Sequence, residues 1–527
     1  MQNINSDLRK KYIYRTIYGV IMLILMYKSI MHFKNLEAYK SKGFLLISVV
    51  LVGLMIISMI TLTKFNSKSI EKQFLVVGLI WGMAFIFINP PYLVPDESVH
   101  IYRAYDIAKG RLFFKGSENN MMLPVGVKKY DKQLWDIINN GKGSKNYIQN
   151  INTPLEKDNL IKYDADATAA YNTIAYIPQS IGMFIGDLLN LSSYFIIILG
   201  RISNFLTWLA LCYLALKYIP IKKDLLFLLM CIPMGMQQAA STSPDALLNS
   251  SSFLLIAYIL YLKFEKEKVD YKDVGIIILL TIIIGSIKLP YIAIGGILIL
   301  IPNNKMKFKS FGKIMLIILI AFSSLAVKSG WEKISAPKIE NSVVMEDSSS
   351  QKNNVEEKKE VISLAGTAKN ILKEPGLFIN KIIYTFKQDR DFYKASFTAY
   401  FGWFKVLAPN WTINLILLML FIFAIKGDEK FKFKIFDKII LILMSIGMYA
   451  ALCGVSLQWK QVPVHQVDVL DGIQGRYFFP FIIGIYFVFQ NTKLKLKLNE
   501  FWLNSYRNIY LCWTLMFSLA MMFQTYF

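Results

Sequence analysis

Long apolar segments recur along the whole sequence, and they constrain the fold more than any other feature. One of them, LLISVVLVGLMIISMITL at 45–62, carries no charged residue. A helix needs about 20 apolar residues to cross a bilayer, and only helices and closed barrels satisfy their backbone groups there. With 55% hydrophobic residues among 527 and a mean hydropathy of +0.42, the chain is predicted to be an all-α integral membrane protein.

Apolar windows predict about thirteen membrane-spanning helices in a polytopic bundle. Several windows are short, so their boundaries are approximate. The predicted spans are 17–31, 44–62, 74–90, 192–216, 224–241, 246–262, 274–287, 290–302, 312–328, 411–426, 436–456, 474–490 and 508–526.

The basic residues, which give the chain a net charge of +23, gather in short connections between the apolar windows. Such connections are typical of the cytoplasmic side, where anionic lipid headgroups attract lysine and arginine. The charge is therefore assigned to the membrane surface, and no nucleic-acid partner is predicted. A cytoplasmic N-terminus, with the first apolar run retained as a helix, makes these connections internal: 64–72, 217–223, 263–272, 305–313, 426–438 and 493–507.

Two long segments, 91–191 and 329–410, then fall on the outer side. The apolar piece at 174–189, broken by Pro178 and glycines, must lie at the outer face, because a span there would invert the later connections. Residues 337–361 are rich in Ser, Asn, Lys and Glu and are predicted to form a disordered tether. The predicted parts are N-terminal spans (1–90), a first outer loop (91–191), a central bundle (192–328), a second outer loop (329–410) and C-terminal spans (411–527).

The first outer loop opens with a concentration of charge, NPPYLVPDESVHIYRAYDIAKG at 89–110. Its prolines end the third span, and the following residues fit a helix with Asp96 and Glu97 in its first turn. Helical spacing places Glu97, His100 and Arg103 near one face. Two explanations stay open. The acidic pair complements the helix dipole with Arg103 as an intrahelical partner, or a carboxylate accepts a proton while nearby cations bind a phosphate.

Three motifs, in this order, resemble those of a known group of membrane proteins. They read PDESVHIYRA at 95–104, STSPDA at 241–246 and QGRYFFP at 474–480. The first is similar to the acidic start of the first outer loop in GT-C glycosyltransferases, and protein O-mannosyltransferases carry a similar Asp-Glu-x-x-His. The combination resembles a family of predicted bacterial membrane proteins of unknown function that is grouped with the GT-C superfamily. The resemblance implies a GT-C-like helical bundle and glycosyl-transfer chemistry, without naming a substrate.

By this resemblance, Asp96 matches the acidic position that serves as general base in GT-C enzymes, and Glu97 is its adjacent partner. His100 and Arg103 follow in the same motif as candidates for substrate binding. Some members of the superfamily use a divalent metal at their acidic motif and others do not, so a metal cofactor stays open and no ligand residues are assigned. The four cysteines lie in apolar runs without ligand spacing and predict no zinc site.

Three charged residues in or beside apolar windows are further candidates, each with a structural alternative. Asp245 in STSPDALL fits the capped first turn of a helix, which explains it without any function. Arg201 lies inside a predicted span, where an unpaired charge costs about 2.5 kcal/mol or more, so it needs a salt-bridge partner or a lipid phosphate. Lys288 lies at an outer turn, where snorkelling to headgroups is the alternative to substrate binding.

Two arginines later in the sequence complete the candidate site. Arg476 begins a predicted span at its outer end, where a guanidinium can bind a donor phosphate through two parallel hydrogen bonds or can anchor the span. Arg390, with Lys387 and Lys394 at near-helical spacing, forms a basic patch suited to a diphosphate or anionic lipid. Neighbouring aspartates can instead neutralise this patch.

The residues and the resemblance together predict an inverting glycosyltransferase of the cell envelope. The predicted donor is a polyprenyl-phosphate sugar, and the predicted acceptor is an envelope glycan or another polar molecule. Membrane lipids are predicted to surround the protein. The predicted location is a bacterial plasma membrane with an extracytoplasmic active site. Asp96 would deprotonate the acceptor with support from Glu97, and Arg103, Arg390 and Arg476 would hold the phosphate. The alternatives are a flippase or transporter of lipid-linked glycans and an envelope polysaccharide polymerase or ligase.

Overall fold

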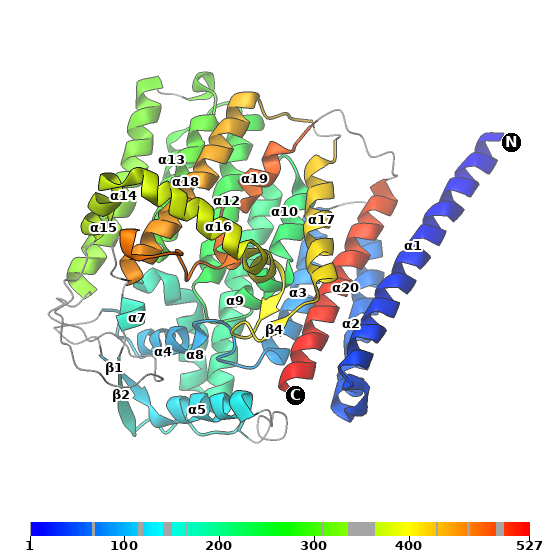
Figure 1. The fold of residues 1–527 in the computed structure, drawn as a ribbon, viewed down its shortest axis with the longest axis horizontal. Helices are drawn as coiled ribbons and strands as arrows, with labels where there is room; N and C mark the ends of the chain where they lie inside the picture. The colour runs from blue at the N-terminus through cyan, green and yellow to red at the C-terminus, as the bar shows by residue number, and fades with distance from the viewer. Residues whose placement is uncertain are drawn as a thin grey trace.

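The computed structural model is mostly helical, with long helices packed side by side and a layer of short helices at one end (Figure 1). It describes residues 2–65, 69–113, 120–140, 150–164, 166–169, 171–306, 310–335, 364–427, 430–460, 464–491 and 500–527. The tether predicted at 337–361 lies outside the described residues.

Eight helices in these ranges are long and apolar enough to cross a membrane. They coincide with eight of the predicted spans, which confirms a membrane-embedded helical protein. α9 packs against α3, α8 and α12, whereas α1 lies at the edge of the bundle (Figure 1). The eight are α1 (Gln2–Asn35), α2 (Lys42–Phe65), α3 (Ile70–Ile88), α9 (Ser193–Tyr218), α12 (Asp245–Phe264), α14 (Ser310–Ser335), α18 (Ile435–Lys460) and α20 (Glu500–Tyr526).

Three predicted spans are not continuous α-helices, and the total of about thirteen is not confirmed. Pro233 has no N–H to continue a helix, so the 224–241 window is divided into α10 (Lys223–Met230) and α11 (Pro233–Ala239). The 290–302 window is a 3-10 helix, η3 (Leu289–Leu300). In the 474–490 window, Pro480 separates η6 (Gly475–Phe478) from α19 (Ile482–Val488). α13 (Tyr271–Ile287) and α17 (Asn410–Ile425) are continuous but shorter than the eight.

The first outer loop folds into a layer at one end of the bundle (Figure 1). Its two short strands pair antiparallel, with Asn120 opposite Asp164, and form a small sheet in an otherwise helical protein. α8 has 12 residues, about 18 Å at the usual helical rise, and is too short to span a bilayer. The layer consists of α4 (Glu97–Ala108), β1 (Asn120–Pro124), α5 (Val125–Asn140), β2 (Leu160–Asp164), α7 (Asp166–Ala169), η2 (Thr173–Tyr176) and α8 (Ile177–Leu188).

The described part of the second outer loop contributes α15 (Leu364–Lys373) and α16 (Pro375–Thr398), followed by a small hairpin of β3 (Tyr400–Phe401) and β4 (Val406–Leu407). α16 packs against η6 and α11, so it supports the QGRY motif. The remaining short elements are η1 (Ala38–Lys40), η4 (Asn303–Lys305) and η5 (Val464–Gln466).

Connections that the sequence assigns to one side of the membrane do lie together in space. Lys223 Nζ is 2.9 Å from a carboxylate oxygen of Glu71, and Lys263 Nζ is 2.8 Å from one of Asp437. These contacts join four different connections between helices. We call this end of the bundle the basic end, and the opposite end, which carries the α4–α8 layer, the site end (Figure 1).

Candidate functional site

Asp96 and Glu97 are neighbours in the sequence but face different parts of the protein. Between α3 and α4 the chain makes a turn in which Tyr92 (φ 67°) and Asp96 (φ 66°) have a left-handed backbone. Trp403 Nε1 fixes the turn by donating to the Tyr92 carbonyl at 3.1 Å. Asp96 precedes α4 and is half-exposed, whereas Glu97 is fully buried in its first turn. The two carboxylates therefore lie in different surroundings.

Glu97 forms a buried ion pair with Arg201 of α9. Arg201 Nε and Nη2 donate to the two carboxylate oxygens at 2.8 and 2.6 Å, and both side chains are 0% exposed. The Thr242 backbone N–H also donates to this carboxylate, at 3.1 Å. The remaining guanidinium N–H groups donate to carbonyls at the end of α3, those of Ile86, Asn89 and Pro90. Glu97 is thus the salt-bridge partner of Arg201, and all five guanidinium N–H groups of Arg201 donate hydrogen bonds.

Asp96 is bound by Arg476, which comes from the far end of the sequence. Arg476 Nη2 donates to Asp96 Oδ2 at 2.7 Å, and Nη1 donates to the Pro95 carbonyl at 3.3 Å. Arg476 lies in η6, which approaches α16 so closely that a Cβ at Gly475 would collide with the Tyr393 carbonyl. The guanidinium is nearly buried while the carboxylate is half-exposed. Asp96 therefore remains accessible although it is paired.

A second ion pair, between Asp245 and Lys288, lies beside the first. Asp245 begins α12 and Lys288 follows α13, and Lys288 Nζ is 2.8 Å from Asp245 Oδ1. The centre of the Tyr477 ring is 4.4 Å from Lys288 Nζ and 5.3 Å from Arg476 Cζ. Because an aromatic face attracts cations, Tyr477 keeps two positive charges near each other. We call Asp96, Asp245, Lys288 and Arg476 the charged cluster.

His100 lies next to the charged cluster and is nearly buried. Its Nδ1 is 2.9 Å from the Tyr176 hydroxyl oxygen. Burial lowers the pKa of His100 to about 4, the two cations of the cluster add to this shift, and the two carboxylates oppose it. His100 is therefore neutral at pH 7, so it can offer a hydrogen bond to a substrate but no positive charge.

We expect acid to destabilise the protein through His100. In the unfolded chain this histidine has its ordinary pKa of about 6.5, so protonation favours the unfolded state as the pH falls from 6.5 towards 4. About 2 kcal/mol of unfolding free energy should be lost at pH 5. His100→Asn removes the titrating group and keeps an acceptor for Tyr176. Between about pH 7.5 and pH 5, the thermal midpoint should fall more for the wild type than for His100→Asn. An equal fall in both proteins would contradict this prediction.

Arg103 and Arg390 form ion pairs with residues that are not members of the charged cluster. Arg103 is fully buried, and its Nη1 is 2.8 Å from Asp106 Oδ2. Its guanidinium also donates to the backbone carbonyls of Arg111 and Leu112. The Arg390 side chain is 67% exposed on α16. These contacts explain Arg103 as an intrahelical partner of Asp106 and Arg390 as a surface charge.

The charged cluster places a half-exposed carboxylate beside a guanidinium and an ammonium group. Such a set can accept a proton and bind an anionic group. The sequence indicated all four charged members but not Tyr477 or Tyr176. Tyr477 directly follows Arg476 in the QGRY motif, which was a usable signal, whereas no spacing links Tyr176 to His100. In the described ranges, no group of three or more His, Cys, Asp or Glu residues could hold a metal ion.

The fold and the charged cluster define a membrane-embedded helical protein with a polar site at one end of its bundle. The chain belongs to the family described as "Predicted membrane protein (DUF2142)", which matches residues 79–485. The motifs at 95–104, 241–246 and 474–480 all lie within this range. No curated protein and no solved structure shows a significant match to the chain.

Proposed function

We propose that the protein is a GT-C-type glycosyltransferase that moves a sugar from a polyprenyl-phosphate donor to a cell-envelope acceptor. The observation that carries this proposal is the charged cluster, which holds a proton acceptor next to two cations. Its members Asp96, Asp245 and Arg476 come from the three motifs that support the resemblance. We place the site on the extracytoplasmic side of a bacterial plasma membrane, since the opposite, basic end suits the cytoplasmic side.

In the proposed reaction, the acceptor hydroxyl attacks the anomeric carbon of the donor sugar. A bond forms between the acceptor oxygen and this carbon, and the bond from the carbon to the phosphate oxygen breaks. Polyprenyl phosphate leaves with the electron pair, and the configuration inverts because attack is opposite to the leaving group. Asp96 takes the hydroxyl proton, and Arg476 and Lys288 neutralise the phosphate charge.

Arg476 has guanidinium N–H groups left for a phosphate oxygen, because its hydrogen bonds to Asp96 and Pro95 use only two of the five. Its Nη groups bind Asp96 and Pro95, while its Nε has no hydrogen-bond partner in the described part of the chain. Lys288 adds a second charge across the Tyr477 ring. Glu97 has no chemical role in this proposal, because Arg201 and Thr242 already occupy its carboxylate.

Arg476→Lys is expected to raise the KM for the donor by about 10- to 100-fold, because a lysine cannot reproduce the guanidinium fork. The assay would supply purified protein in nanodiscs with a panel of polyprenyl-phosphate sugars and measure release of polyprenyl phosphate. Arg390→Lys is the matched control, since this exposed arginine should leave the KM unchanged. An equal rise of the KM in both variants would contradict phosphate binding by Arg476.

The same assay separates the alternative functions. Movement of labelled lipid between leaflets without release of polyprenyl phosphate, for every donor tested, would favour a flippase or transporter. Turnover only with diphosphate-linked glycans would favour a polymerase or ligase.

A further inference from the structure

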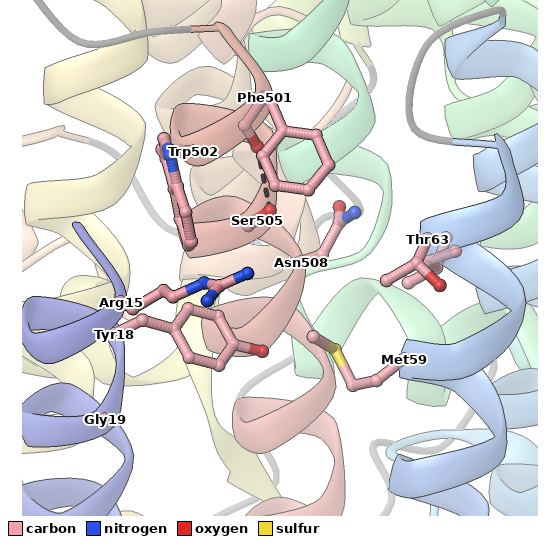
Figure 2. A pocket seen from close by; sticks show the side chains of 10 residues that line it. Arg15, Tyr18, Gly19, Met59, Thr63, Phe501, Trp502, Ser505 and Asn508 are labelled. Atoms are coloured by element: carbon pink, nitrogen blue, oxygen red, sulfur yellow. Dashed lines mark hydrogen bonds between the residues drawn. The ribbon is translucent and has the colours of Figure 1, made fainter. Parts of the chain in front are cut away.

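A cavity of about 560 Å³ lies between α1, α2 and α20 near the basic end (Figure 2). The three helices are each long and apolar enough to cross a membrane, so the cavity borders lipid. Its described lining combines aromatic rings, aliphatic groups and a few polar side chains, with no acidic residue among them. A negatively charged group would therefore meet no like charge on the described walls.

Three of the hydrogen-bond donors that line this space, those of Arg15, Tyr18 and Asn508, suit a phosphate. Figure 2 shows the guanidinium of Arg15, the hydroxyl of Tyr18 and the amide of Asn508 directed towards it from α1 and α20. Across the described ranges, no carboxylate pairs with Arg15 and no acceptor takes the Tyr18 hydroxyl proton. Both groups are thus available to a ligand.

Neighbouring contacts fix the orientation of the Asn508 amide. Its Oδ1 accepts hydrogen bonds from Arg507 Nε at 3.1 Å and Nη2 at 2.9 Å. Arg507 is buried and is itself held by Asp224 and Gln73. A flipped amide would place N–H groups against the guanidinium, so the NH₂ group of Asn508 must be the free side.

We propose that this cavity binds the phosphate headgroup of an anionic glycerophospholipid. A guanidinium, a phenol hydroxyl and an amide NH₂ are all donors, which suits the acceptor oxygens of a phosphate. Met59, Leu62 and Gly19 form an apolar wall for an acyl chain. Trp502 and Tyr18 are residues typical of the headgroup level of a bilayer.

The combination of a polar and an apolar wall favours a lipid over a soluble phosphate. A free phosphate ion would use the donors but would leave the apolar wall without a partner, whereas a phospholipid uses both. This site is separate from the charged cluster at the other end of the bundle. The proposal is therefore independent of the glycosyltransferase function.

Native mass spectrometry of the purified full-length protein tests this proposal. Phosphatidylglycerol, phosphatidylcholine and diacylglycerol are titrated separately in detergent, and phosphatidylglycerol should bind about tenfold more tightly than the other two. Arg15→Gln should weaken phosphatidylglycerol binding about tenfold or more, because a charge-assisted contact is lost. Lys28→Gln removes the same charge from an exposed position of α1 outside the cavity and should have no effect.

A second pair of variants tests the cavity without changing charge. Gly19 lines the cavity, and a Cβ placed there meets nothing within 4 Å, so Gly19→Leu should fill the space of the acyl chain. Leucine also favours a helix more than glycine, which protects the fold. Gly53→Leu in α2 is the matched control, because its Cβ is equally unobstructed but it does not line the cavity. Only Gly19→Leu should weaken binding, about as much as Arg15→Gln.

Several results would overturn the proposal. Equal binding of the three lipids would contradict recognition of an anionic headgroup. Equal phosphatidylglycerol binding by Arg15→Gln and Lys28→Gln would contradict binding in this cavity. Displacement of phosphatidylglycerol by about 10 mM inorganic phosphate would assign the donors to a soluble anion, since competition on that scale needs a Kd near millimolar. None of these measurements depends on sugar transfer, so the two proposals fail separately.

Discussion

Asp96→Asn is expected to lower the rate of sugar transfer by about 10²- to 10⁴-fold, the range for loss of a general base. An amide cannot accept the proton of the attacking hydroxyl. Its carbonyl oxygen can still accept the hydrogen bond from Arg476, so the KM for the donor should change little while kcat falls. Initial rates of polyprenyl phosphate release at saturating donor, measured in the same nanodiscs for both proteins, give this ratio.

The local structure makes this substitution a clean test. Asp96 has a φ of 66°, and asparagine is one of the residues that tolerate a left-handed backbone. The Asp96 side chain also makes no capping hydrogen bond to α4, so the start of the helix does not depend on its charge. Loss of activity in this variant should therefore occur in a protein that still folds, and its thermal midpoint should fall less than that of Glu97→Gln.

Asp391→Asn serves as the control for Asp96→Asn. The Asp391 side chain is 77% exposed on α16, where it pairs with Lys394, and its loss should leave the transfer rate within about twofold of the wild type. Full turnover by Asp96→Asn would reject Asp96 as the base. A loss of lipid movement in the Asp96→Asn variant, in a protein that transfers no sugar, would assign this residue to a transport pathway.

Glu97→Gln is expected to cost about 3–5 kcal/mol of unfolding free energy, because it leaves the buried guanidinium of Arg201 without a counter-charge. The pair is fully buried, and its shortest N–O distance is 2.6 Å. Stability can be measured by thermal or denaturant unfolding in detergent, with tryptophan fluorescence as the signal. The double variant Glu97→Gln/Arg201→Gln should lose less than the sum of the two single variants.

The Glu37–Lys40 pair offers a matched control for this measurement. Its N–O distance is also 2.6 Å, but its side chains are 64% and 59% exposed. Glu37→Gln should cost less than about 1 kcal/mol, since solvent screens an exposed ion pair and both groups are hydrated without it. A similar loss in Glu37→Gln and Glu97→Gln would mean that burial of Arg201 is not what makes the Glu97 contact important.

The long helices could be predicted because a membrane imposes a simple length and hydropathy rule. The same rule failed at 224–241 and 474–490, where the windows are apolar enough but Pro233 and Pro480 interrupt the backbone hydrogen bonds. Apolar composition measures where a segment can lie. It does not measure whether its helix is continuous.

The candidate site was predictable in its parts but not in its pairing. The motifs supplied Asp96, Asp245 and Arg476, but helical spacing treated Asp96 and Glu97 as members of one helix. Asp96 instead precedes the helix with a left-handed backbone, so the two carboxylates diverge. The partners lie 380 residues apart for Asp96 and 104 for Glu97, and local spacing carries no information at such separations.

The Glu97–Arg201 contact also limits how the protein can move. It joins the end of α3, the start of α4, the N-terminal half of α9 and the segment before α12. Separating these parts would expose two unpaired charges in a region of low dielectric constant. We expect them to shift as one rigid body in any opening of the site for the proposed reaction. Arg476 belongs to η6, which packs against α16 and lies outside this rigid body. We therefore expect η6 and α16 to move when the site opens for a bulky lipid-linked substrate.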